Sequence, residues 1–249
     1  MGKPRRLQGG FTLMEMVISL VILGIISLAI GSYLQLGAQG YVGAVNRDRT
    51  QAIARFALEK MTREIRHAAP NSVAVSGNCL SFYPVQLSGF YLGNPTGADV
   101  DFSPTLGTLS EWITIKSDAW MAVGFSSSKQ YDDKQNTIFT VEDENDDEVL
   151  TATLSLPLTS SSPASRLYSY SDKVSYCFNR ATHELHRLVD NELPSNNTLI
   201  AQGVDVATFT SEGAGMNSNG MVHIGLTIKS DQTGESSIYD HTVQVINVL

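Results

Sequence analysis

Residues 11–30 read FTLMEMVISLVILGIISLAI, and this stretch contains one charged residue, Glu15. As an α-helix, these residues would extend about 30 Å, which is the thickness of the hydrocarbon core of a bilayer. Beyond Glu15 the polar residues are only Ser19 and Ser27, whereas a helix in a protein core would show polar positions at helical spacing. The stretch is therefore predicted to be a membrane-spanning helix.

The charge distribution around the stretch sets its expected orientation. Lys3, Arg5 and Arg6 precede it, and no basic residue follows it immediately. By the positive-inside rule, this pattern keeps the N-terminus in the cytoplasm and carries everything downstream across the membrane. A secretory signal peptide and a plain membrane anchor are the competing interpretations. A signal peptide would be cut after its apolar run and rarely carries a carboxylate inside it, and the residues after Ile30 offer no clean cleavage site.

Glu15 is the unusual residue of the stretch. An ionised carboxylate in hydrocarbon costs roughly 2.5–3.5 kcal/mol on insertion scales, so it needs a partner or a function. Within one chain, the carboxylate could bond to Thr12 or to the N-terminus of its own chain. The sequence leaves open whether the partner is local or belongs to another molecule.

The helical pattern continues past the apolar stretch and becomes amphipathic between residues 47 and 69. Apolar residues recur at four- and three-residue steps, with Ile53 and Phe56 beside them: Ala54, Leu58, Met61, Ile65 and Ala68. Glu59 and Arg63 form a favourable i,i+4 pair on the other face. One helix over residues 11–69, ended by Pro70, is expected. Four glycines favour local melting inside it, because each costs roughly 1 kcal/mol against alanine: Gly31, Gly37, Gly40 and Gly43.

The start of the apolar stretch carries a family resemblance. The residues GFTLME at Gly10–Glu15, after a short basic leader, resemble the class III signal of type IV pilins and type II secretion pseudopilins. The resemblance implies that residues 1–10 are a leader and that a prepilin peptidase cuts after Gly10 and methylates Phe11. It also implies that Glu15 pairs with the N-terminal amine of a neighbouring subunit in a filament, which would supply the missing partner.

A second resemblance is narrower. The run at 54–75 followed by CLSFYP at 79–84 is similar to the MshO-type minor pilins of the mannose-sensitive haemagglutinin (MSHA) pilus. It implies a minor pilin in type IV pilus biogenesis, acting in filament initiation or in the tip complex. A tip adhesin or partner-docking module, a type II secretion pseudopilin and a membrane-tethered enzyme are the alternatives.

These resemblances also imply partners and a location. The expected partners are a prepilin peptidase, other major and minor pilins, the inner-membrane pilus assembly machinery and, before assembly, membrane lipid. The chain is expected to cross the inner membrane once with its head in the periplasm, and then to enter a pilus filament or its tip. A net charge of −8 argues against nucleic acid as a partner, because phosphate binding needs a basic face.

Beyond Pro70 the periodicity shortens from helical to strand-like. Short β-branched or aromatic runs between turn residues predict strands at residues 72–75, 79–85, 111–117, 137–141, 149–156, 173–179, 183–190, 204–210, 221–230 and 241–249. Residues 180–182 are predicted to close a hairpin, and residues 87–107 and 159–165 to form loops. The expected fold class is α+β, with a mainly antiparallel sheet in a β-rich head, residues 70–249, packed on the helix. The resemblance implies the type IV pilin fold.

The two cysteines, Cys79 and Cys177, both follow the apolar stretch. If that part of the chain is exported, one disulfide closing a loop of nearly a hundred residues is expected, and two buried free thiols are the alternative. No CxxC zinc or redox pattern occurs, since neither cysteine has a close neighbour in sequence.

The densest charge in the chain is the run EDENDDE at 142–148. Hard cations prefer many oxygen ligands, so the run is a weak calcium candidate through Glu142, Asp143, Asp146 and Asp147. It lacks the glycine and the spacing of an EF-hand loop, and a solvated hairpin tip is the favoured interpretation.

Other candidate sites are weaker still. His183 and His186 are three apart on a predicted strand and would point to opposite faces, which disfavours zinc. Tyr168, Tyr170 and Tyr176 suggest either a sugar-binding platform or, preferably, core packing. No catalytic or phosphate-binding motif occurs, so no enzymatic activity and no cofactor are expected.

Overall fold

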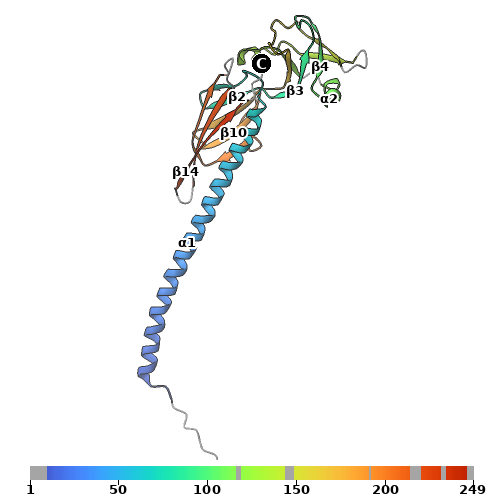
Figure 1. Ribbon diagram of the computed structural model, residues 1–249. Helices are drawn as coiled ribbons and strands as arrows, with labels where there is room; N and C mark the ends of the chain where they lie inside the picture. Colours follow the sequence, from blue (N-terminus) through green and yellow to red (C-terminus); the bar gives the residue numbers. More distant parts are fainter. Residues whose placement is uncertain are drawn as a thin grey trace, which may run out of the picture. The chain divides into compact units, whose positions relative to one another are not determined.

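A computed structural model of the chain describes residues 10–115, 119–143, 149–190, 192–213, 220–230 and 234–245 (Figure 1). Contacts divide the chain into two compact units, Met1–Arg49 and Thr50–Leu249. Helix α1 (Leu13–Arg66) contributes to both units. The first unit and the second unit are therefore described separately.

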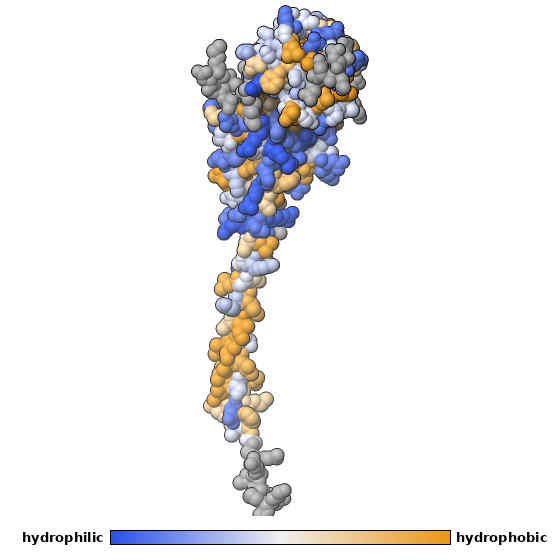
Figure 2. All heavy atoms as spheres, turned by 45° about the vertical axis from the view of Figure 1, so that its right-hand side comes forward, coloured by the Kyte–Doolittle hydropathy of each residue, from blue (hydrophilic) through white to orange (hydrophobic). Residues whose placement is uncertain are grey.

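The first unit contains the N-terminal part of α1. Every side chain from Gly10 to Val42 is exposed, and Figure 2 shows an almost continuous hydrophobic surface on this part of the helix. The hydroxyls of Ser19 and Ser27 each donate to the carbonyl four residues earlier, at 2.7 Å. Such bonds satisfy the polar groups within the helix, as a hydrocarbon environment requires. The helix runs through all four of its central glycines, so the expected local melting is wrong.

In the second unit, α1 buries one face. The expected apolar stripe is confirmed in that Ala54, Met61 and Ile65 are fully buried and Leu58 packs at the edge of the same core. Thr50 and Ala57 are also buried on this part of α1, whereas Phe56 is 56% exposed. Phe56 is next to Ala57 in sequence but lies off the buried face of the helix.

Two antiparallel sheets cover this face of α1. Sheet 1 has the order β1-β2-β9-β10-β11 and consists of β1 (Ala74–Ser76), β2 (Cys79–Phe82), β9 (Val174–Asn179), β10 (Glu184–Val189) and β11 (Leu199–Gln202). Sheet 2 has the order β12-β13-β14 and consists of β12 (Val204–Glu212), β13 (Met221–Lys229) and β14 (Ser236–Gln244). Their inner faces share one hydrophobic core with the helix. On β10, Arg187 donates to both carboxylate oxygens of Glu64 at 2.8 and 3.1 Å, which fastens the helix to sheet 1.

A third antiparallel sheet lies in a segment inserted between β2 and β9. Sheet 3 has the order β5-β8-β3-β4-β7-β6 and consists of β3 (Val85–Tyr91), β4 (Asp99–Pro104), β5 (Trp120–Ala122), β6 (Ile138–Glu142), β7 (Leu150–Leu154) and β8 (Arg166–Tyr170). It has its own core, to which helix α2 (Leu109–Ile113) contributes Trp112. Residues 85–170, which also include helix α3 (Ser128–Asp132), are here called the inserted lobe.

The α+β class, the long N-terminal helix and the antiparallel sheets confirm the expected fold class. Most predicted strands of sheets 1 and 2 form where their alternation indicated, and the hairpin joining β9 to β10 is present. His183 has a φ of +56° and completes that turn, so β10 begins at Glu184. The predicted connector at 159–165 also lies outside the strands.

Two predictions in the inserted lobe are wrong. The strand expected at 111–117 is the short helix α2 over its described part, because Trp112 packs edge-on against Phe102 with ring centroids 4.6 Å apart. The expected loop at 87–107 contains the end of β3 and all of β4. A Cβ at Gly89 would lie 2.9 Å from the carbonyl oxygen of Ser103, so glycine here permits close strand pairing and does not indicate a loop.

Candidate processing and assembly site

The residues before α1 form a helix start. The carbonyl of Thr12 accepts hydrogen bonds from the amides of Glu15 and Met16 at 3.1 and 3.2 Å. The Thr12 hydroxyl accepts a second bond from the Glu15 amide at 3.3 Å. The sequence TLME thus places threonine as the cap and glutamate at the third helical position, and the bond to the Thr12 hydroxyl is one half of a capping box. The cap fixes the helix to begin at Leu13 and leaves Gly10 and Phe11 outside it.

This geometry exposes the Gly10–Phe11 peptide bond. Both residues lie outside regular secondary structure, and the Phe11 side chain is 83% exposed. Exposed backbone next to an element terminus is where proteases cut most readily. The rest of the basic leader, residues 1–9, lies outside the described residues.

Glu15 stands at the head of the exposed apolar surface. Among the described residues, no cation or hydrogen-bond donor contacts its carboxylate. Among the described residues, helix α1 is long and apolar enough to cross a membrane. The position near the helix N-terminus lessens the cost of the negative charge through the helix dipole, but does not supply a counter-charge. Within the described residues, the Glu15 carboxylate thus has no counter-charge.

The acidic run shows no metal site over its described part. Glu142 ends β6 opposite Thr151, and Asp143 follows it. Asp146 and Asp147 lie outside the described residues. Within the residues that the structure covers, no group of three or more His, Cys, Asp or Glu side chains could hold a metal ion.

The two histidines are engaged separately. The Nδ1 atom of His183 lies 3.1 Å from the carbonyl of Val204. His186 is buried, with Nδ1 3.0 Å from the Thr198 hydroxyl and Nε2 3.2 Å from Glu184. The two side chains therefore serve different local hydrogen bonds.

The tyrosines pack mostly inside the head. Tyr170 and Tyr176 are fully buried, and Tyr168 is half-buried. Tyr170 lies edge-on to Tyr131 and Tyr83, with centroid distances of 5.0 and 5.6 Å. The preferred interpretation, core packing, is confirmed for the two buried rings, and no exposed platform forms from the three.

The disulfide between Cys79 and Cys177 is present, with the two Cα atoms 4.1 Å apart. The cysteines are directly paired residues of adjacent strands β2 and β9. Because the inserted lobe begins after β2 and ends before β9, this bond joins the two strands that flank the insertion.

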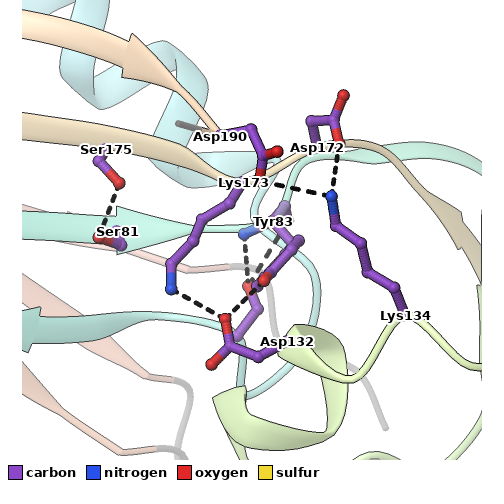
Figure 3. A network of polar contacts seen from close by, with 9 residues as sticks. Ser81, Tyr83, Asp132, Lys134, Asp172, Lys173, Ser175 and Asp190 are labelled. Carbon is purple, nitrogen blue, oxygen red and sulfur yellow. Dashed lines mark hydrogen bonds and ion pairs between the residues drawn. The ribbon is translucent and has the colours of Figure 1, made fainter. Parts of the chain in front are cut away.

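A network of charged groups that sequence reasoning missed joins the inserted lobe to sheet 1 (Figure 3). Asp132, at the end of α3, accepts hydrogen bonds from Tyr83 at 2.6 Å and from Lys173 at 2.8 Å. Lys134 pairs with Asp172 at 2.7 Å and with Asp190 at 3.4 Å. The partners come from four distant segments, so no local pattern in the sequence could have indicated them.

The ionised forms of Asp132 and Lys134 are favoured in this network. Partial burial acts to raise the pKa of Asp132, but the bonds from Lys173 and Tyr83 outweigh it and hold the pKa below its ordinary value. Burial, followed by the bond to Asp132, raises the pKa of Tyr83. Burial acts to lower the pKa of Lys134, but Asp172 and Asp190 raise it overall. Each acid is paired with a base, an arrangement typical of a structural ion-pair lattice.

Replacing Asp132 with asparagine should destabilise the head at pH 7 by on the order of 1 kcal/mol, since the pairs are partly exposed. Because the folded pKa of Asp132 is lowered, its contribution is present above the unfolded pKa of about 3.9 and is lost as pH falls through the folded value. Thermal unfolding of the full chain in detergent between pH 7 and pH 3 measures this. The matched control is Asp133→Asn, one residue along; equal effects of the two variants would contradict the prediction.

Comparison with known families identifies the N-terminal segment. Residues 5–31 match the prokaryotic N-terminal methylation motif. Comparison with curated proteins finds no match, and comparison with solved structures finds none. The matched segment contains the exposed Gly10–Phe11 bond, the Thr12 cap and Glu15, and it implies processing by a prepilin peptidase and assembly with other pilins. This motif, at the start of an apolar N-terminal helix in an α+β fold, supports a type IV pilin-like protein.

Proposed function

We propose that this chain is a minor pilin of an MSHA-like type IV pilus. A prepilin peptidase removes residues 1–10 and methylates the new N-terminal Phe11. The mature chain is held in the inner membrane by its helix, residues 11–69, which spans the bilayer through residues 11–30. Its head, residues 70–249, lies in the periplasm. The assembly machinery then moves it into a filament, in initiation or at the tip.

The observation that carries this proposal is the construction of the N-terminus. The methylation motif coincides with an exposed Gly10–Phe11 bond, a capped helix start and an apolar surface that no described residue covers. A helix of this kind is stable in lipid and can also pack against the apolar helices of other subunits. The same helix thus serves as membrane anchor and as filament core.

Glu15 acquires its partner in the assembled state. Cleavage after Gly10 creates a new amine on Phe11, and an amine from a neighbouring subunit can approach a Glu15 carboxylate that no described residue occupies. A charge pair in hydrocarbon is favourable relative to two separate charges there, so the pair also fixes the axial register between subunits. The role is structural, and the chain performs no chemistry of its own.

The experiment that tests processing is intact mass and N-terminal sequencing of the protein from membranes of cells with an active prepilin peptidase. The expected mature chain begins at Phe11 and carries one extra methyl group. The same measurement in cells lacking the peptidase is the control and should give a chain that begins before Gly10. A chain that begins at Met1 in both strains, or after the apolar run, would overturn the proposal.

A further inference from the structure

A groove lies between the amphipathic part of α1 and strand β14. Its volume is about 670 Å³, and it is lined along the helix from Gln51 to Arg66 and on the strand by Tyr239 and His241. All of the lining residues belong to the second unit. The helix contributes about 22 Å of wall over these residues, the length of roughly seven residues of extended chain.

The groove is rich in positive charge. Arg55, Arg63 and Arg66 line it and are exposed, against a single carboxylate from Glu59. In the ranges that the structure describes, none of the three guanidinium groups forms an ion pair, and the Glu59–Arg63 pair expected from the sequence is absent; Lys60 pairs with Glu64 instead, at 3.4 Å. Three guanidinium groups in a row, each able to bind a carboxylate through two hydrogen bonds, favour an acidic ligand.

On the strand side of the groove, one edge of sheet 2 has no partner strand among the described residues. Strand β14 pairs with β13 on one side and is the last strand of sheet 2. It is nine residues long, and most of its side chains are exposed, Ile238 among them. Long edges of this kind pair readily with an added strand. Another strand beside β14 would run along the groove with its alternate side chains directed at the arginines.

We propose that this groove binds an extended, carboxylate-rich segment of a neighbouring pilin-like subunit, which adds as a strand to β14 and places its carboxylates on Arg55, Arg63 and Arg66. Backbone bonds to the edge supply affinity, and the guanidinium groups select for acidic side chains. Leu58 and the ring of Tyr239 supply the apolar floor between them. That the partner is a neighbouring subunit rests on the proposed function, whereas the binding chemistry does not.

Binding can be measured with the chain's own acidic run as a probe. A labelled peptide of residues 140–150, TVEDENDDEVL, is titrated with the full chain in detergent micelles by fluorescence anisotropy. The comparison peptide TVQNQNNNQVL has every carboxylate replaced by an amide. We expect the acidic peptide to bind at least about tenfold more tightly than the amide peptide, and to weaken with salt.

Matched variants locate the binding. Arg55→Gln, Arg63→Gln and Arg66→Gln together should weaken the acidic peptide at least about tenfold. The control triple Lys129→Gln, Arg180→Gln and Lys229→Gln removes the same charge from exposed positions outside the groove and should leave binding within about twofold. Equal losses in the two triples, equal affinity for the two peptides or no binding would each overturn the proposal.

Strand addition has its own test. A peptide N-methylated on alternate backbone amides cannot donate to the β14 edge and should bind at least about tenfold more weakly than its parent. Unchanged affinity would show that the arginines act without the edge, against the proposal. Because these measurements use purified protein and a peptide, they can fail while processing at Gly10 succeeds, and the converse also holds.

Discussion

Replacing Glu15 with glutamine should leave the chain processed and inserted, yet reduce its incorporation into filaments at least about tenfold, a difference of about 1.4 kcal/mol or more. Glutamine has nearly the shape of glutamate and retains the ability to complete a capping box with Thr12. The helix start is therefore preserved, and only the charge is lost. Quantitative immunoblotting of sheared filaments against membranes measures the ratio.

Two further variants separate the charge of Glu15 from its side-chain bulk. Glu15→Ala removes the carboxylate and shortens the side chain but keeps the backbone amide that donates to Thr12, so it should show the same assembly loss if the charge pair is what matters. Asp48→Ala, an exposed carboxylate further along α1, is the matched charge control and should assemble normally. Normal incorporation of Glu15→Gln together with failure of Glu15→Ala would assign the effect to side-chain shape and remove the charge-pairing role.

Replacing Cys79 and Cys177 together with serine should destabilise the head by about 4–5 kcal/mol, the chain-entropy cost of opening a loop of this size. The effect should be largest in the inserted lobe, because the loop that the disulfide closes, residues 79–177, contains the whole lobe. Both tryptophans, Trp112 and Trp120, belong to the lobe, so their fluorescence during thermal unfolding in detergent reports on it.

The same pair of strands provides the control for the disulfide. Ser81 and Ser175 face each other two residues along β2 and β9, and their hydroxyls lie 2.9 Å apart. Replacing both with alanine removes one hydrogen bond and should cost about 1 kcal/mol. Reduction of the wild-type protein should reproduce the cysteine variant, and neither change should alter cleavage at Gly10. A melting temperature unaffected by loss of the cysteines would refute the stabilising role.

The inserted lobe is where prediction from the sequence failed. Residues 87–107 carry glycines and prolines that indicate a loop, but Gly89 is required by the close approach of β4. The run at 111–117 alternates like a strand, but Trp112 is fully buried against Phe102 as part of a helix. In both cases a contact with a distant segment outweighs the local preference, which short apolar runs specify only weakly.

The charged network could not be predicted from the sequence because it also depends on contacts between distant segments. Tyr83, Asp132 and Lys173 are separated by tens of residues, and each is an unremarkable residue in its own stretch of sequence. The groove between α1 and β14 could not be predicted either. The sequence placed its arginines on the helix, but it predicted an ion pair between Arg63 and Glu59. Only the packed arrangement of helix and sheet edge shows which cations face a common space.

Features that depend on local order could be predicted from the sequence. The length and apolarity of residues 11–30 and the amphipathic spacing from Ala54 to Ile65 specify the helix, because its hydrogen bonds link residues four apart. The disulfide followed from there being two cysteines. The insertion of sheet 3, the ion-pair lattice and the groove could be recognised only in the tertiary structure, because strand pairs and ion pairs join segments that are far apart in the chain.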